Sequence, residues 1–197
     1  MDSTTICNLA LAKIGDQSIT SLDDNTVESR FCKLYYPVSL GECLMLNTWN
    51  FATKSASLSQ SIPNPIFDWN YSYALPTDFA RITKFNSFGP NDPISNYEIQ
   101  GQNLLTDEDH ASIVYIFNNP DPSTFTPSFV SILTLKLASD LAKPLAGSLE
   151  LKNQLLQQFE TSISEAGRID ANSTRPQKVE PWVNSALVRS RFAGALP

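Results

Sequence analysis

Residues 6–58 decide the fold, and they read ICNLALAKIGDQSITSLDDNTVESRFCKLYYPVSLGECLMLNTWNFATKSASL. At the start of this stretch, apolar residues recur every three or four positions up to Gly15. This pattern predicts a short helix that ends at the glycine. Ser3 or Thr4 is the expected N-cap of this helix, because both side chains can accept a hydrogen bond from the first turn.

A second helical segment is expected to start within the polar run from Ser21 to Asn25, whose side chains suit an N-cap. Pro37 interrupts this segment. Since proline lacks the backbone N–H that a helix interior needs, we expect a kink there, or a break into two helices. The expected apolar stripe of this segment is Val27, Phe31, Leu34, Tyr35 and Val38, and the residues expected to face inward after the proline are Leu40, Cys43, Leu44 and Leu46.

After the helical segment, short runs of alternating apolar residues lie between loops rich in proline, asparagine and aspartate. Such runs predict strands, and the expectation is one small antiparallel sheet of about four or five strands. The expected strands lie in Trp49 to Leu58, Tyr71 to Leu75, Phe79 to Phe85, a hairpin around Gly101 and Gln102, and Ser112 to Phe117.

A second helical block follows the strands. Pro127 suits a first helical position after Thr126 as N-cap, and the helix is apolar on most faces as far as Lys143, which favours a central place in the fold. Ser148 can cap the last helix. Its apolar residues recur every four positions, at Leu151, Leu155, Phe159 and Ile163.

These patterns predict an α+β fold that is mainly helical. The expected architecture is an antiparallel or orthogonal helix bundle with a small antiparallel β insertion and an extended C-terminal tail. The helices are expected within about residues 3–47 and 126–168, and the β-rich insertion within about 49–117. Residues 1–170 would then form the body, and residues 171–197 an extended arm.

The arm differs from the body in charge. The chain carries a net charge of −6, and residues 171–197 contribute +3, which leaves −9 on residues 1–170. A strongly acidic body does not grip nucleic acid across its surface. The negative charge favours either a body that repels DNA or one that is simply kept soluble.

Residues 171–197 are predicted to dock on a partner. Their weak apolar pattern and interior prolines do not predict an independent fold, whereas their aromatic and arginine side chains are typical of interface anchors. The alternative is a tail that folds back on its own domain. The residues expected to form the docking interface are Trp182, Leu187, Val188, Arg189, Arg191 and Phe192.

No residue pattern indicates catalysis. The cysteines Cys7, Cys32 and Cys43 lack metal or redox spacing, and we interpret them as buried apolar residues in a reducing compartment. His110 is the single histidine, and it lies in a carboxylate-rich turn without a marked serine or metal-ligand partner. We therefore expect no enzyme activity, no catalytic or metal-binding residues and no cofactor.

The sequence also gives no sign of membrane insertion. The N-terminus lacks the basic segment of a signal peptide, and no apolar run approaches the ~20 residues that a membrane span needs. Neither a leader sequence nor a membrane partner is expected.

Three ordered pieces of the sequence resemble the head-to-tail adaptor proteins of tailed bacteriophages, the head-completion or tail tubular A-type family. The first is ITSLDDNT at residues 19–26, followed by SRFCKLYYP at residues 29–37. The second is WNFATK at residues 49–54, where Thr48 replaces a proline that is frequent in the family. The third is YALPTDFARI at residues 73–82. The later helices agree with the family only in kind.

The resemblance implies a virion structural protein at the head–tail junction, assembled in the host cytoplasm. Adaptors of this family form a cyclic homo-oligomer of about twelve subunits under the portal protein. The ring extends the DNA channel, helps to retain packaged DNA and provides the platform for tail attachment. The expected partners are therefore the portal protein, the tail tube or nozzle protein, further copies of this chain, and DNA that passes through the lumen without sequence-specific binding.

Two other functions remain open from the sequence. A virion-associated peptidoglycan hydrolase would need two protected carboxylates in a groove, and the 20 acidic residues single out no such pair. A stopper or terminator at another tail joint would differ from an adaptor only in its partner.

Overall fold

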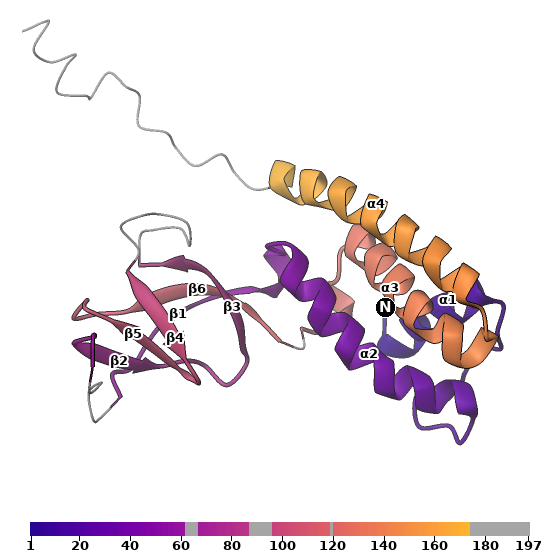
Figure 1. The fold of residues 1–197 in the computed structure, drawn as a ribbon, viewed down its shortest axis with the longest axis horizontal. Coiled ribbons are helices and arrows are strands. Elements are labelled where there is room, and N and C mark those ends of the chain that lie inside the picture. The colour runs from indigo at the N-terminus through magenta and orange to yellow at the C-terminus, as the bar shows by residue number, and fades with distance from the viewer. Residues whose placement is uncertain (62–66, 87–95, 119, 174–197) are drawn as a thin grey trace, which may run out of the picture.

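The computed structural model describes residues 1–61, 67–86, 96–118 and 120–173. It has a mixed α/β fold with four helices and two small antiparallel sheets, and about half of the described residues are helical. Figure 1 shows the helices gathered in one lobe and the strands in another. The predicted docking residues Trp182, Leu187, Val188, Arg189, Arg191 and Phe192 lie outside the described residues.

The first helix, α1, spans Ser3–Ile14. Its N-cap is Asp2 instead of Ser3 or Thr4, because the Asp2 carboxylate accepts a hydrogen bond from the backbone N–H of Thr5 at 3.0 Å. Gly15 ends the helix as predicted. Its left-handed φ of 76° is a conformation that glycine adopts without the steric cost of a side chain.

The second helix, α2, spans Val27–Leu46 as one helix, so the predicted alternative of a break into two helices at Pro37 is wrong. Thr26 is the N-cap, and its hydroxyl accepts a hydrogen bond from the backbone N–H of Ser29 at 3.1 Å. Pro37 removes only the donor to the Lys33 carbonyl. Both residues are exposed, so water can satisfy that carbonyl and the helix continues.

The buried face of α2 confirms the predicted inward residues Leu40, Cys43 and Leu44, and it differs from the prediction elsewhere. Val27, Leu34 and Val38 are 46%, 62% and 53% exposed, and Leu46 is exposed as well. Two inward positions carry serines that make hydrogen bonds: the Ser29 hydroxyl donates to the Ser21 carbonyl at 2.9 Å, and the Ser39 hydroxyl donates to Asp140 Oδ2 at 2.9 Å. The buried residues of α2 are Ser29, Cys32, Tyr36, Ser39, Leu40, Cys43 and Leu44.

The connection between α1 and α2 is held by side-chain hydrogen bonds to its backbone. Asn8 donates from Nδ2 to the Ile19 carbonyl at 2.9 Å and accepts from the Ile19 N–H at 2.8 Å. The Asp24 carboxylate accepts from the backbone N–H groups of Thr20 and Ser21, each at 2.9 Å. The piece ITSLDDNT is therefore a hydrogen-bonded connection between two helices.

Trp49 belongs to the helical core, although the sequence predicts a strand from this residue. Its side chain is 1% exposed, and its indole N–H donates to the Cys43 carbonyl at 3.0 Å. Its ring packs edge-on against Phe129, with 4.9 Å between the ring centroids. A 3₁₀ turn, η1 (Asn50–Ala52), follows, and the strand begins only at Thr53.

The strands form two three-stranded antiparallel sheets instead of the predicted single sheet. Their orders are β1-β6-β3 and β2-β5-β4. The hairpin at Gly101 and Gln102 is confirmed, since it joins β4 to β5. The strands are β1 (Thr53–Ser57), β2 (Tyr71–Ala74), β3 (Phe79–Phe85), β4 (Tyr97–Gln100), β5 (Asn103–Thr106) and β6 (Ser112–Phe117).

The two sheets enclose a core of their own, separate from the helical core. Within β6, Ile113 and Tyr115 point into this strand core, whereas Ile116 points into the helical core. This division follows from the alternation of side chains along a strand. The strand core comprises Tyr73, Leu75, Ile82, Phe85, Leu104, Ala111, Ile113 and Tyr115.

A short 3₁₀ turn, η2 (Pro122–Thr124), leads to α3 (Pro127–Ala146) and α4 (Leu149–Ser173). Thr126 caps α3, as predicted, and the helix continues past Pro144 to Gly147, which has a φ of 66°. The prediction that α3 is central is confirmed, because α1, α2 and α4 all pack against it. The predicted boundary at residue 170 falls within α4. None of the described helices combines the length and apolar character that crossing a bilayer requires.

The hydrogen bonds of Asn8 lead to a first prediction. Replacing Asn8 with alanine leaves the backbone N–H and carbonyl of Ile19 without their side-chain partner, so the free energy of unfolding should fall by roughly 1–3 kcal/mol. Urea denaturation followed by circular dichroism measures the change. The exposed Asn25→Ala in the same connection serves as control and should be nearly neutral. Equal effects of the two substitutions would contradict this account of the connection.

Candidate interaction surfaces

The reactive and metal-ligating side chains considered in the sequence do not come together at one site. His110 and Asp109 are exposed and pair with each other at 2.8 Å. Within the described ranges, no group of three or more histidine, cysteine, aspartate or glutamate side chains is placed to hold a metal ion. The features of the described residues that could carry a function are therefore surfaces.

The three cysteines are buried and free, as the sequence predicts. Burial raises the pKa of Cys43 to about 12. A hydrogen bond with Cys32, together with burial, raises the pKa of Cys7. A buried neutral thiol of this kind packs as a small apolar group and reacts slowly.

A polar cluster joins α2 to α3 in an otherwise apolar contact. The Lys136 ammonium lies 2.7 Å from Asp140 Oδ2 and 2.6 Å from Glu42 Oε2, and the Ser39 hydroxyl donates to Asp140 Oδ2 at 2.9 Å. Lys136 and Asp140 are 14% and 16% exposed. Burial by itself would lower the pKa of Lys136, but the hydrogen bonds to Asp140 and Glu42 outweigh it and hold that pKa above its usual value.

The solvent-facing side of α2 carries an apolar stripe. Val27, Leu34, Val38 and Met45 are all exposed, and Met45 is 47% exposed. Phe31 and Gly41 fill the intermediate positions, so the spacing alternates between four and three residues, as in the seam between two packed helices. We call Val27, Leu34, Val38 and Met45 the α2 outer stripe.

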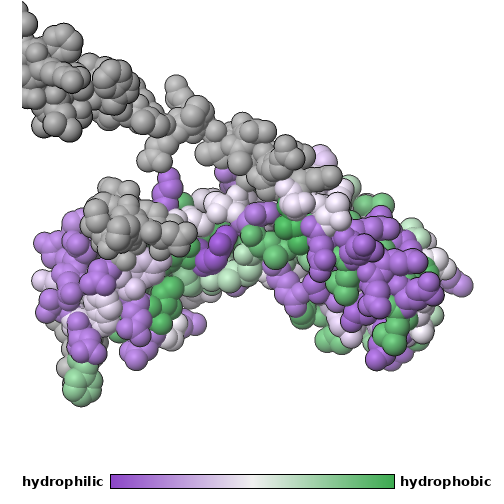
Figure 2. Space-filling view, turned by 45° about the horizontal axis from the view of Figure 1, so that its top comes forward, coloured by the Kyte–Doolittle hydropathy of each residue, from purple (hydrophilic) through white to green (hydrophobic). Residues whose placement is uncertain are grey.

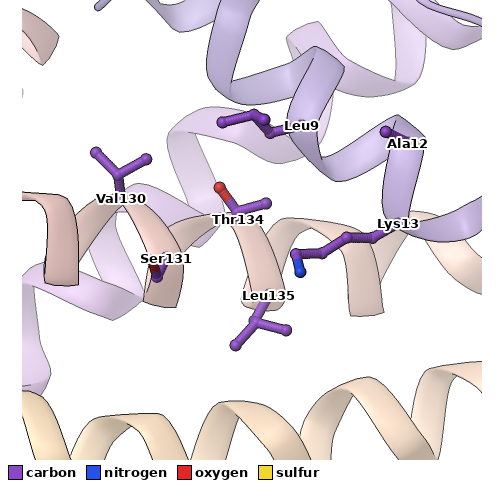
Figure 3. A pocket seen from close by; sticks show the side chains of 7 residues that line it. All are labelled: Leu9, Ala12, Lys13, Val130, Ser131, Thr134 and Leu135. Carbon is purple, nitrogen blue, oxygen red and sulfur yellow. The ribbon is translucent and has the colours of Figure 1, made fainter.

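A groove of about 430 Å³ lies between α1 and α3 (Figure 3). Leu9 is 41% exposed at this groove, although the sequence places it on the packed face of α1. Thr134 is 3% exposed, its hydroxyl points into the gap, and that hydroxyl has no hydrogen-bond partner in the described part of the chain. We call this site the α1/α3 groove, lined by Leu9, Ala12, Lys13, Val130, Ser131, Thr134 and Leu135.

A second pocket of about 430 Å³ lies where the two lobes meet, between α2 and Asn118. Tyr36 lines it, and burial raises the pKa of this phenol to about 12. The Tyr36 hydroxyl has no hydrogen-bond partner among the described residues, and neither do Nε and Nη2 of Arg81. Figure 2 shows apolar side chains interrupting the polar surface in the region where the lobes meet.

The sequence pattern places Val27, Leu34 and Val38 on the packed face of the helix, whereas they are exposed, and it does not single out Met45. Ser29, Cys32 and Ser39 distinguish the buried face of α2 from the exposed one, because they recur at helical spacing on the side opposite to the stripe. Small polar residues at such positions are typical of closely packed helices. A prediction from hydropathy alone misses them, because it expects valine and leucine to be buried in preference to serine. The α1/α3 groove carries no comparable signal, because it depends on how two separate helices meet.

Burial of the cysteines predicts their reactivity. The folded chain should resist aromatic disulfide reagents, because all three Sγ atoms are shielded by burial and the raised pKa values of Cys7 and Cys43 disfavour their thiolates. All three thiols should react after denaturation in guanidinium chloride. Absorbance of the released thiolate measures both reactions, and rapid labelling of the folded chain would contradict the burial of these residues.

The polar cluster gives a prediction that depends on pH. Lys136→Met should lower the free energy of unfolding by roughly 1–3 kcal/mol near neutral pH, because Asp140 then loses its buried cation. Since folding raises the pKa of Lys136, its contribution is fully present below the ordinary lysine value of about 10.4 and is lost as pH rises through the folded-state value. The stability gap between the two proteins should therefore narrow at strongly alkaline pH.

Urea titrations of the original chain and the Lys136→Met variant across neutral and alkaline pH measure this gap. The exposed Lys143→Met on the same helix is the matched control and should change stability little at any pH. A loss of equal size in the control, or a gap that widens above pH ~10.4, would contradict the assigned role of Lys136.

Comparison of the chain with protein-family models and with curated proteins gave no match. Its function is therefore argued from its own residues, their contacts and the surfaces they leave uncovered.

Proposed function

We propose that this chain is a virion structural protein, a head-to-tail adaptor that forms a ring under the portal of a tailed bacteriophage. The ring would extend the DNA channel, help to retain packaged DNA and provide the platform for the tail tube or nozzle protein. No catalytic residue, metal or cofactor is assigned in this role. The site of action would be the head–tail junction of the virion, after assembly in the host cytoplasm.

The observation that carries the proposal is that the three family-like pieces coincide with three structural joints. ITSLDDNT forms the hydrogen-bonded connection between α1 and α2. WNFATK contains Trp49, which fills the helical core, and leads from there into β1. In YALPTDFARI, Asp78 accepts hydrogen bonds from Lys54 at 2.7 Å and from the Tyr115 hydroxyl at 3.0 Å. Because each piece occupies a position that holds two parts of the structure together, the resemblance favours a fold shared with the adaptor family over a chance similarity of composition.

The finer architecture belongs to the same proposal. We infer that the four helices form the antiparallel or orthogonal bundle of an adaptor, that residues 1–170 are its body and that the rest of the chain is an extended docking arm. The charge distribution supports this division. An acidic body of net charge −9 lets DNA slide past without adhesion, and a basic arm of +3 suits an acidic partner surface.

The test is to mix the purified chain with the cognate portal ring and to measure the mass of the complex. We expect a mass gain that corresponds to a ring of subunits. A version truncated after Ser173 keeps α4 intact and should lose this gain, because it lacks the arm.

Point substitutions in the arm sharpen the test. Trp182→Ala should weaken portal binding by roughly 30-fold, about the 2 kcal/mol of an interface anchor, whereas Ser185→Ala in the same segment should have little effect. No complex with the full chain would contradict the portal assignment. Binding to the tail tube but not to the portal would indicate a stopper or terminator instead. Undiminished binding by the truncated version would contradict the role of the arm alone.

A further inference from the structure

The α2 outer stripe and the α1/α3 groove are two apolar surfaces on one helical lobe that no described residue covers. From their exposed fractions, the four residues of the stripe present on the order of 350–400 Å² of surface, which is the size of the largest patch on a typical monomer and about half of what one partner buries in a standard interface. A contact through the stripe would therefore include residues around it.

The stripe faces directly away from the core of its own molecule. Leu34, Val38 and Met45 each lie two residues after a buried residue of α2, namely Cys32, Tyr36 and Cys43. Two residues correspond to a rotation of about 200° around a helix. No described part of the same chain therefore covers the stripe, and Leu34 at 62% exposure is its most prominent side chain.

The groove opens on the opposite side of the helical lobe. On α3, Lys136 and Asp140 face α2, since they pair with Glu42 and Ser39. Thr134 lies two residues before Lys136, so it points about 200° away from α2. The stripe and the groove therefore face in nearly opposite directions, with α3 between them.

The two surfaces are complementary in shape. Apolar side chains project from the stripe, whereas the groove is a hollow of about 430 Å³ with the small residues Ala12 and Ser131 among its lining. Lys13 at the groove has no ion-pair partner among the described residues, whereas Glu42 beside the stripe is already paired with Lys136. These features fit a ridge on one copy to a groove on another.

We propose that copies of this chain associate head to tail, with the α2 outer stripe of one copy packed into the α1/α3 groove of the next. Opposed and different surfaces give a heterologous contact, which repeats until a ring closes. A two-fold dimer through the stripe alone would leave the groove uncovered. The inference deepens the proposed function and rests on it for ring closure, while the contact itself does not depend on the portal.

Pairwise cross-linking tests the contact. Val38→Cys on the stripe and Ser131→Cys at the groove each place one exposed thiol on the full chain, because the three native cysteines are buried. A short bismaleimide should give a covalent dimer when the two variants are mixed, and neither variant should give one alone. Val38→Cys mixed with Glu160→Cys on the outer face of α4 is the matched control and should give none.

The same mixtures are then examined in the presence of the cognate portal ring. Cross-linking with and without portal supports the contact. A Val38→Cys dimer formed without the second variant would show a two-fold interface and overturn the proposal. Absence of the mixed product both in the free chain and in a portal-bound ring would also overturn it.

A charged substitution on the stripe provides an independent test of the contact. Leu34→Glu should reduce the yield of the mixed cross-link about tenfold or more, while the helical circular dichroism stays unchanged because Leu34 is exposed. Gln157→Glu on α4 adds the same charge elsewhere and should leave the yield unchanged. An unaffected yield in Leu34→Glu would overturn the assigned role of the stripe.

The two proposals can fail separately. If the mixed cross-link forms but no variant binds the portal, the adaptor function falls and the contact between copies stands. If a ring forms on the portal without the mixed cross-link, the adaptor function stands and subunits meet through other surfaces.

Discussion

The burial of α3 on nearly all its faces is the constraint on which the rest of the structure depends. A helix with apolar residues around its circumference is stable in water only if other elements cover it. Here α1, α2 and α4 provide that cover, and Trp49 adds to it by packing on Phe129 of α3. Three helices do not cover a fourth completely. The α1/α3 groove is the part that they leave open, so the core and the candidate interface have the same physical origin.

The two lobes are joined through a small number of shared residues. Trp49 and Ala52 belong to the helical core although they lead into β1, and Ile116 reaches the same core from β6. The hydrogen bonds of Asp78 to Lys54 and Tyr115 then tie the turn before β3 to its two neighbours, β1 and β6. The pieces WNFATK and YALPTDFARI supply Trp49, Lys54 and Asp78 to these joints.

Sequence patterns located the helices and most strands, and they were least accurate where burial depends on neighbours. Gly15, Thr126 and the Gly101–Gln102 turn were predictable because their signals are local. The predicted apolar stripe of α2 was wrong at Val27, Leu34 and Val38, because Ser29, Cys32 and Ser39 are buried on the opposite side although their hydropathy is lower. Pro37 did not break the helix, since its lost donor lies on the wet side. The division of the described strands into two sheets was not predictable, because it depends on pairing between segments far apart in the sequence. The groove was not predictable either, because it depends on how two separate helices meet.

One feature of β6 has a mechanical consequence. Its alternate side chains enter two different cores, with Tyr115 in one and Ile116 in the other. A force that pulls the lobes apart would therefore have to extract an apolar side chain from one of two close-packed interiors before the strand could move. Anchoring in both interiors gives the joint between the lobes a stiffness that a flexible linker lacks.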